Sequence, residues 1–228
     1  CIYFIISKIN IKWDKDLKKN IFINRRQAIV SFVGFSIFPT IGIADKSNDL
    51  KDQMRRHFIG DKNAPIKIKE YFSLTCGHCA TFHKSTLPKL KQKYIDQGKI
   101  EMEFVDYPLD RLAVIAATLA RTLPNDSYID AIDVLLKRQK QWAYSNKPIE
   151  ELLSISKLFG ISSSQFNKIM ENIPLMKKIV TRMEKESKQF NIESTPTFII
   201  NNEHKISGAV SFKEFETKLL TFVKSQNS

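Results

Sequence analysis

Hydrophobic and polar residues alternate along two short stretches in the first half of the chain. Every second residue from 66 to 72 shares one face, and residues 100–105 alternate in the same way. Such a period of two predicts β-strands. Between them, residues 79–94 carry a hydrophobic stripe at helical spacing, in which Pro88 predicts a kink. The order strand, helix, strand predicts a parallel pair with a right-handed crossover.

The pattern changes in the second half of the chain. From residue 108 to about 191 it is helical throughout, and it predicts four or five helices. A short apolar strand at 198–200, a turn at Asn201-Asn202 and a strand around 204–207 follow, before a last helix that Ser211 opens. These elements predict an α/β domain in two parts, interrupted by helices. We divide it into a polar leader (45–60), a first part (61–107), a helical insertion (108–191) and a second part (192–228).

The N-terminal segment, residues 1–44, has the order of charges expected for an exported protein. Residues 27–44 contain no charged side chain, and Arg25-Arg26 directly precede them. Positive, apolar and small residues in this order are typical of a signal peptide, and we expect cleavage near Ala44. An uncleaved membrane anchor is the alternative, which Pro39 weakens.

Composition and charge exclude several classes of protein. The chain has 228 residues, of which 43% are hydrophobic, so it can bury a core and is not disordered. Its formal net charge is +12, which would suit a nucleic-acid partner. Since no run of Lys and Arg is longer than two residues, we expect a lysine-rich solvated surface and no nucleic-acid partner.

The cysteines provide the candidate chemistry. Cleavage near Ala44 would remove Cys1 and leave only the motif Cys76-Gly77-His78-Cys79. A single C-x-x-C pair in an exported chain is either a redox centre or half of a metal site. Because there is no second cysteine pair, we expect no metal, and no cofactor besides the Cys76–Cys79 disulfide itself. We expect His83, four residues after Cys79, on the surface of its helix.

The position of the motif assigns different roles to its two sulfurs. A strand leads into it and a helix leaves it, so Cys76 would lie at a helix N-terminus, where a thiolate is stabilised and the cysteine pKa falls. A protonated His78 would lower the pKa of this sulfur further. Cys76 is therefore the expected nucleophile, and Cys79, one turn further on, points inward and resolves mixed disulfides. Stabilisation of the thiolate makes the disulfide a stronger oxidant.

Two further positions are candidate site residues. Glu70 falls on the buried face of its strand, where a carboxyl group beneath Cys79 could relay a proton; a twisted strand with a solvated Glu70 is the alternative. Thr195-Pro196 precedes a buried strand, and a cis bond there would leave the main chain of Thr195 free to pair with a substrate peptide. A plain loop proline is the alternative.

These motifs together resemble the DsbA family of thiol–disulfide oxidoreductases. The resemblance spans residues 61–225 and rests on the segments 63–65, 70–73, 76–79, 105–110, 195–199 and 207–209. It implies a thioredoxin fold of class α/β, in which helices flank a mixed central sheet and an all-helical subdomain is inserted. It also implies that Cys76 is the nucleophile, Cys79 the resolving thiol, Glu70 the buried acid, and Thr195-Pro196 the cis-proline loop. The chain departs from the family at Gly77, where proline is common, and Cys-Gly-His-Cys is more similar to protein disulfide isomerase.

We therefore expect a periplasmic protein-disulfide oxidoreductase that donates its disulfide to reduced exported proteins. The resemblance implies a monomer and a membrane partner, similar to DsbB and linked to quinone, that restores the disulfide. An isomerase or reductase of the same fold is one alternative, and a thioredoxin-fold binding protein or chaperone is another. A membrane-anchored form facing the periplasm is the alternative location.

Overall fold

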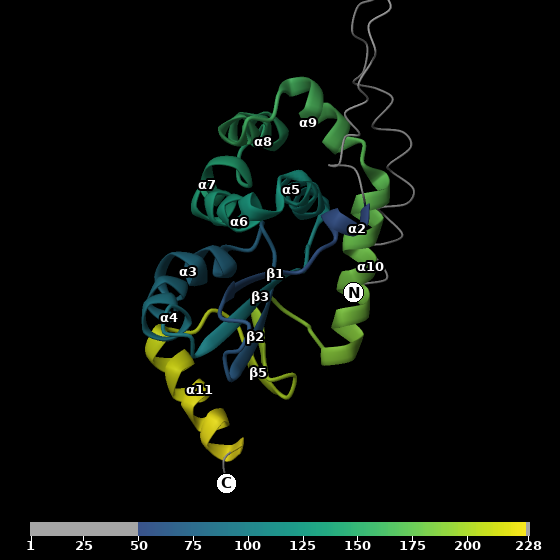
Figure 1. Cartoon of the computed structure of the whole chain (residues 1–228). Helices are drawn as coiled ribbons and strands as arrows, with labels where there is room; N and C mark the ends of the chain where they lie inside the picture. The colour runs from purple at the N-terminus through teal and green to yellow at the C-terminus, as the bar shows by residue number, and fades with distance from the viewer. Residues whose placement is uncertain (1–49, 227–228) are drawn as a thin grey trace, which may run out of the picture. The chain divides into compact units, whose positions relative to one another are not determined.

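The computed structural model describes residues 50–226, so the expected signal peptide and the start of the expected leader lie outside the described residues. Five strands form one mixed sheet in the order β1-β3-β2-β4-β5 (Figure 1). The strands are β1 (His57–Gly60), β2 (Ile66–Phe72), β3 (Ile100–Asp106), β4 (Thr197–Ile200) and β5 (His204–Ser207). The α-helices are α2 (Leu50–Gln53), α3 (Gly77–Ser85), α4 (Leu87–Leu90), α5 (Arg111–Thr122), α6 (Tyr128–Lys137), α7 (Gln139–Trp142), α8 (Pro148–Ser156), α9 (Ser163–Met170), α10 (Ile173–Phe190) and α11 (Phe212–Gln226). Shorter helical turns are η2 (Lys91–Ile95, a π-helix), η3 (Asn125–Ser127) and η4 (Lys157–Phe159).

The four strands that the hydrophobic pattern predicts are all present. β2 and β3 are parallel, with Ile66 opposite Ile100, and β4 runs antiparallel to β2. The hairpin between β4 and β5 turns at Asn201 and Asn202, which both have positive φ angles, 50° and 59°. Asparagine tolerates this conformation better than most residues, so the two asparagines suit the three-residue loop 201–203 between the strands.

One strand lies where the sequence analysis expected only a polar leader. β1 pairs antiparallel with β3, so the sheet begins before residue 61. His57 is buried in it and stacks on Tyr128, with ring centroids 3.7 Å apart. A histidine and a four-residue strand are weak signals, since the partners that bury them lie far along the chain.

Helices cover both faces of the sheet. Alternate residues of β2 point to opposite sides: Phe72 lies against His83 of α3, while Tyr71 lies against Phe190 of α10. On the first side α11 also packs, because its Phe215 contacts Phe198 of β4 at 5.0 Å between ring centroids. In Figure 1, α3, α4 and α11 lie to one side of the sheet and α10 lies to the other.

Pro88 starts a helix, whereas the sequence predicts a kink within one. α3 ends at Ser85, and α4 begins at Leu87 with Pro88 in its first turn. Proline lacks the N–H that a helix interior needs, but in a first turn this donor has no partner anyway. The helical stripe of residues 79–94 is therefore divided between two α-helices and a π-helix.

The helical insertion has six α-helices, α5 to α10, where four or five were expected; α7 is a single turn. α10 also belongs to the sheet layer, because Arg182 near its middle donates to Glu103 of β3 at 2.9 Å. The predicted start of α9 is confirmed, since Ser162 and Gln165 form a reciprocal capping box. No helix among residues 50–226 is long and apolar enough to cross a membrane.

A buried ion pair connects the insertion to the sheet. Asp106, at the end of β3, accepts hydrogen bonds from Arg121 of α5 and from the hydroxyl group of Tyr128, the latter at 2.9 Å. Arg121 also donates to the main-chain oxygens of Gln53 and Arg55 at 2.9 and 3.0 Å. The side chain of Arg121 is fully buried, so its removal would leave Asp106 as a buried charge without its cation.

We predict that Arg121→Met lowers the free energy of unfolding by about 3–5 kcal/mol, the usual effect of removing one partner of a buried ion pair. Urea denaturation measures this value. Lys147→Met is the matched control, because Lys147 forms an exposed pair with Glu150 at 3.2 Å, and it should cost at most about 1 kcal/mol. Equal losses in the two variants would contradict the prediction.

Candidate active site

The dithiol lies where the sheet meets α3. A short loop after β2 leads into Cys76, which is the N-cap of α3 with extended backbone angles of φ −82° and ψ 117°. Cys79 follows in the first turn of the helix and is fully buried, while Cys76 is half-buried. Both are free thiols. The structure thus places Cys76 at a helix N-terminus, where unpaired N–H groups point toward its sulfur.

The sulfur of Cys76 lies among hydrogen-bond donors. Its pKa is lowered to about 5, first because the Cys79 thiol donates to it, and then because Thr195 and the main-chain N–H groups of Cys79 and His78 do so. Partial burial opposes this effect and is outweighed. The imidazole of His78 is exposed, so the contribution of this residue comes from its main chain, whereas the sequence pointed to its ring.

Cys79 has the opposite character. Burial raises the pKa of its thiol, and so do the hydrogen bond to Cys76 and the negative charge of Glu70. At neutral pH the reduced site therefore holds one thiolate, at Cys76, and one thiol, at Cys79. This difference supplies a half-exposed nucleophile beside a second sulfur that keeps its proton.

Glu70 lies on the buried face of β2, as the alternation predicts. It has no exposed surface, and the parallel register places it opposite Phe104 of β3. The Nε2 atom of His83 lies 3.1 Å from each of its two carboxyl oxygens. A solvated Glu70 is thereby excluded.

The expectation that His83 lies on the helix surface is wrong, because this residue is only 2% exposed. It stands four positions after Cys79 and therefore shares its side of α3. Its ring packs among those of Phe72, Phe82 and Phe104, with centroids 5.7–6.0 Å away. The position of His83 in the helix favours burial, but a polar residue is usually expected on the surface.

The Thr195–Pro196 peptide bond is cis, in the loop that leads into β4. The thiol of Cys76 donates to the main-chain oxygen of Thr195 at 3.3 Å. The hydroxyl group of Thr195 is buried, and in the described part of the chain no hydrogen-bond partner for it is found. It is therefore available to donate to the sulfur once the thiolate forms.

Gln139 of α7 is a site residue that the sequence analysis missed. Its side-chain nitrogen donates to the main-chain oxygens of Leu74 and Cys76, at 2.8 and 2.9 Å. Gln139 thereby connects the helical insertion to the loop before α3 and holds this loop in place. Since 63 residues separate Gln139 from Cys76, no local pattern could have indicated this contact.

The two cysteines, the buried acid and the cis-proline loop therefore meet at one end of the sheet. Among residues 50–226, no three His, Cys, Asp or Glu side chains gather in a way that could hold a metal ion. A dithiol at a helix N-terminus beside a cis-proline defines the site of a thioredoxin-fold thiol–disulfide exchange protein.

Comparison with known proteins agrees with this class. A family model described as thioredoxin matches residues 52–220. The crystal structure of α-DsbA1 from Wolbachia pipientis is similar with a TM-score of 0.67 and 30% sequence identity, over 74% of this chain and 90% of that one. The chain therefore belongs to the thioredoxin superfamily and, within it, to the DsbA family.

Two relatives in sequence carry related names. A putative protein-disulfide oxidoreductase of Rickettsia typhi is 33% identical over 144 residues, which are 63% of this chain and 53% of the relative. A probable disulfide bond formation protein D of Bacillus anthracis is 25% identical over 181 residues, 76% of this chain and 83% of that protein. The chain thus spans little more than half the length of the Rickettsia relative.

Proposed function

We propose that the protein is an exported protein-disulfide oxidoreductase, which donates the Cys76–Cys79 disulfide to reduced exported proteins. The observation that carries this proposal is the difference between the two sulfurs: hydrogen bonds lower the pKa of Cys76 to about 5, while burial raises that of Cys79. A stabilised thiolate favours the reduced protein, so its disulfide is readily given away.

The exchange takes place in two steps. A substrate thiolate attacks the sulfur of Cys76, the Cys76–Cys79 bond breaks, and its electron pair leaves on Cys79, which takes up a proton. A second substrate thiolate then attacks the substrate's sulfur in the mixed disulfide, and Cys76 leaves as a thiolate. The substrate gains a disulfide, and its two electrons remain on the enzyme dithiol. The low pKa of Cys76 makes it a good leaving group in the second step.

The cis-proline loop holds the substrate in this scheme. Thr195 lies beside the sulfur of Cys76, and its main chain can pair with an extended substrate segment while the mixed disulfide exists. The same residue stabilises the thiolate through its hydroxyl group. Thr195 therefore serves both binding and sulfur chemistry.

Glu70 relays a proton to Cys79 in this proposal. It is buried beside Cys79, whose pKa its charge raises. Since Cys79 is itself buried, the carboxylate of Glu70 takes up a proton from water and passes it to the sulfur of Cys79 as this sulfur leaves, and Glu70 returns to its charged form. His83 is a positioning residue, because its Nε2 atom contacts both oxygens of Glu70 and restricts the carboxyl group to one orientation.

The protein acts in the periplasm as a monomer, and a quinone-linked membrane partner restores its disulfide. Membership of the DsbA family supports these three statements, as does the order of charges in residues 1–44 for export. Reoxidation needs an external oxidant, and the quinone is the acceptor of the two electrons.

The test of this function is equilibration of the purified protein with mixtures of reduced and oxidised glutathione. We predict a reduction potential above that of thioredoxin, about −270 mV, and oxidation of a two-cysteine peptide by one equivalent of protein. Cys76→Ser and Cys79→Ser should each abolish the peptide oxidation. Ser85→Ala, at the exposed end of α3, is the control and should leave it unchanged. A potential below about −300 mV, the range of structural disulfides, without peptide oxidation would refute the proposal and favour a binding protein.

For Glu70→Gln we predict that mixed-disulfide formation at neutral pH slows by about tenfold or more, since general acids contribute at least this much. The rate should then depend more steeply on pH, because the proton must reach Cys79 from water without a relay, while the pKa of Cys76 stays low. Stopped-flow kinetics over a range of pH measures this effect. Glu101→Gln, which removes a carboxylate paired with Lys67 on the outside of β3, is the control. An unchanged pH profile in the Glu70 variant would exclude the relay.

A further inference from the structure

A cavity of about 390 Å³ opens beside the dithiol, between α3 and the helical insertion. Its first wall is α3, and its second is formed by α7 and the residues directly after it. The lining residues are Gly77, Ala80, Thr81, Lys84, Gln139, Lys140 and Tyr144. Gly77 directly follows Cys76 in the chain, so the cavity begins one residue from the reacting sulfur.

The cavity lies on a face of α3 whose first two turns carry small side chains. Gly77, Ala80 and Thr81 share this face at helical spacing and Lys84 ends it, while Cys79 is buried on the other side of the helix. A Cβ atom at Gly77 would lie 3.5 Å from the hydroxyl oxygen of Tyr144, which is an ordinary van der Waals contact. A side chain at this position would therefore narrow the cavity where it meets the active site, without a clash.

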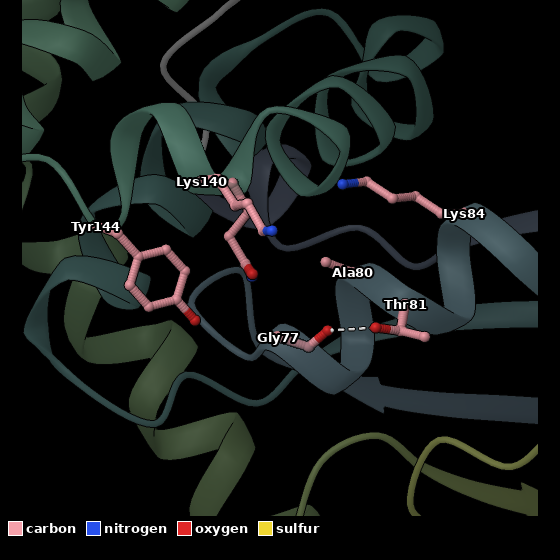
Figure 2. Close-up of a pocket in the computed structure, with 7 residues that line it drawn as sticks. Gly77, Ala80, Thr81, Lys84, Lys140 and Tyr144 are labelled. Carbon is pink, nitrogen blue, oxygen red and sulfur yellow. Dashed lines mark hydrogen bonds between the residues drawn. The ribbon is translucent and has the colours of Figure 1, made fainter.

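The charges at the cavity are all of one sign. Lys84 and Lys140 are exposed, and neither forms an ion pair with any residue that the structure describes. No Asp or Glu belongs to the lining. Figure 2 shows the two ammonium groups extending toward one another from opposite walls, and the hydroxyl group of Tyr144 directed toward Gly77. Tyr144 is 64% exposed, which is unusual for a large aromatic side chain.

We infer that this cavity binds an acidic side chain of the substrate polypeptide, close to the cysteine that reacts with Cys76. This inference rests on the proposed function. Two ammonium groups at one opening repel each other, and a carboxylate between them relieves this repulsion and accepts a hydrogen bond from Tyr144. The volume is at the small end of ligand pockets, roughly 300–1,000 Å³, so it suits one or two side chains.

The geometry limits where the acidic residue stands in the substrate. Consecutive Cα atoms are about 3.8 Å apart, and the cavity begins at the residue after Cys76. A substrate residue one or two positions from the reacting cysteine therefore reaches it. The lining does not include Thr195 or Pro196, so the acidic side chain can bind while the cis-proline loop holds the substrate main chain.

The test uses synthetic two-cysteine peptides that differ only in the residue beside the reacting cysteine. This residue is Glu, Gln or Lys, and it precedes the cysteine in one series and follows it in another. We expect kcat/KM for oxidation of the Glu peptide to exceed that of the Lys peptide by about five- to tenfold, the size expected for two partly exposed charge pairs. Added salt should reduce this ratio. The double variant Lys84→Glu/Lys140→Glu should abolish or reverse it.

The matched control is Lys89→Glu/Lys177→Glu. It changes the net charge by the same amount at two exposed lysines that do not line the cavity, and it should keep the preference for Glu. Survival of this preference in the Lys84/Lys140 variant, or its absence in the unmodified protein, would overturn the inference.

A second measurement does not depend on activity. Peptides with serine in place of both cysteines are titrated into the protein, and fluorescence anisotropy reports binding. The Glu peptide should bind more tightly than the Lys peptide, and only the Lys84/Lys140 variant should lose this difference. Equal binding of the peptides overturns the cavity as an acidic subsite even if the protein is an oxidase. Selective binding without oxidation of any peptide supports the subsite and refutes the proposed function.

Discussion

The chemistry of this site depends on hydrogen bonds donated to a single sulfur atom. Ionisation of Cys76 is favoured by the Cys79 thiol, by Thr195 and by main-chain N–H groups at the start of α3, and these donors come from two separate places in the chain. A thiolate that accepts several hydrogen bonds is stabilised relative to the thiol, as is any anion at a helix N-terminus. The fold brings these donors together, since β2 and α3 place the sulfur and the cis-proline loop approaches it from the far end of the sequence.

The partner sulfur makes that stabilisation useful. Cys79 is buried on the helix side that packs against the sheet, above Glu70 and His83, and it keeps its proton when Cys76 does not. In a symmetrical dithiol either sulfur could ionise, and the charge on one would disfavour ionisation of the other. Here one sulfur attacks or leaves, and the other closes the disulfide. The exposed side of the same helix bears the glycine and lysine that open toward the helical insertion. One helix of nine residues and its N-cap thus carry the nucleophile, the resolving thiol and one wall of the cavity.

Local patterns predicted the parts of the molecule whose partners are near in sequence. The alternation in residues 66–72 predicted both β2 and the burial of Glu70, and the position of Cys76 between strand and helix predicted its place at a helix N-terminus. The pattern did not predict β1, because its buried residue is a histidine that Tyr128, far along the chain, covers. The burial of His83 and Gln139 was not predicted for a related reason. Each is a polar residue whose hydrogen-bond partner lies elsewhere in the fold: Glu70 for His83, and the main-chain oxygen of Leu74 for Gln139. The cis peptide bond was considered as a possibility but could not be established without the loop that surrounds it.

The most direct test of this account is a pH titration of the reduced protein, followed by the ultraviolet absorbance of the thiolate, with Cys76→Ser as the blank. The account predicts a single transition with a pKa near 5 that the blank lacks. A transition near the value of an unperturbed cysteine, about 8.5, would show that the donors around Cys76 do not stabilise its anion and would contradict the account.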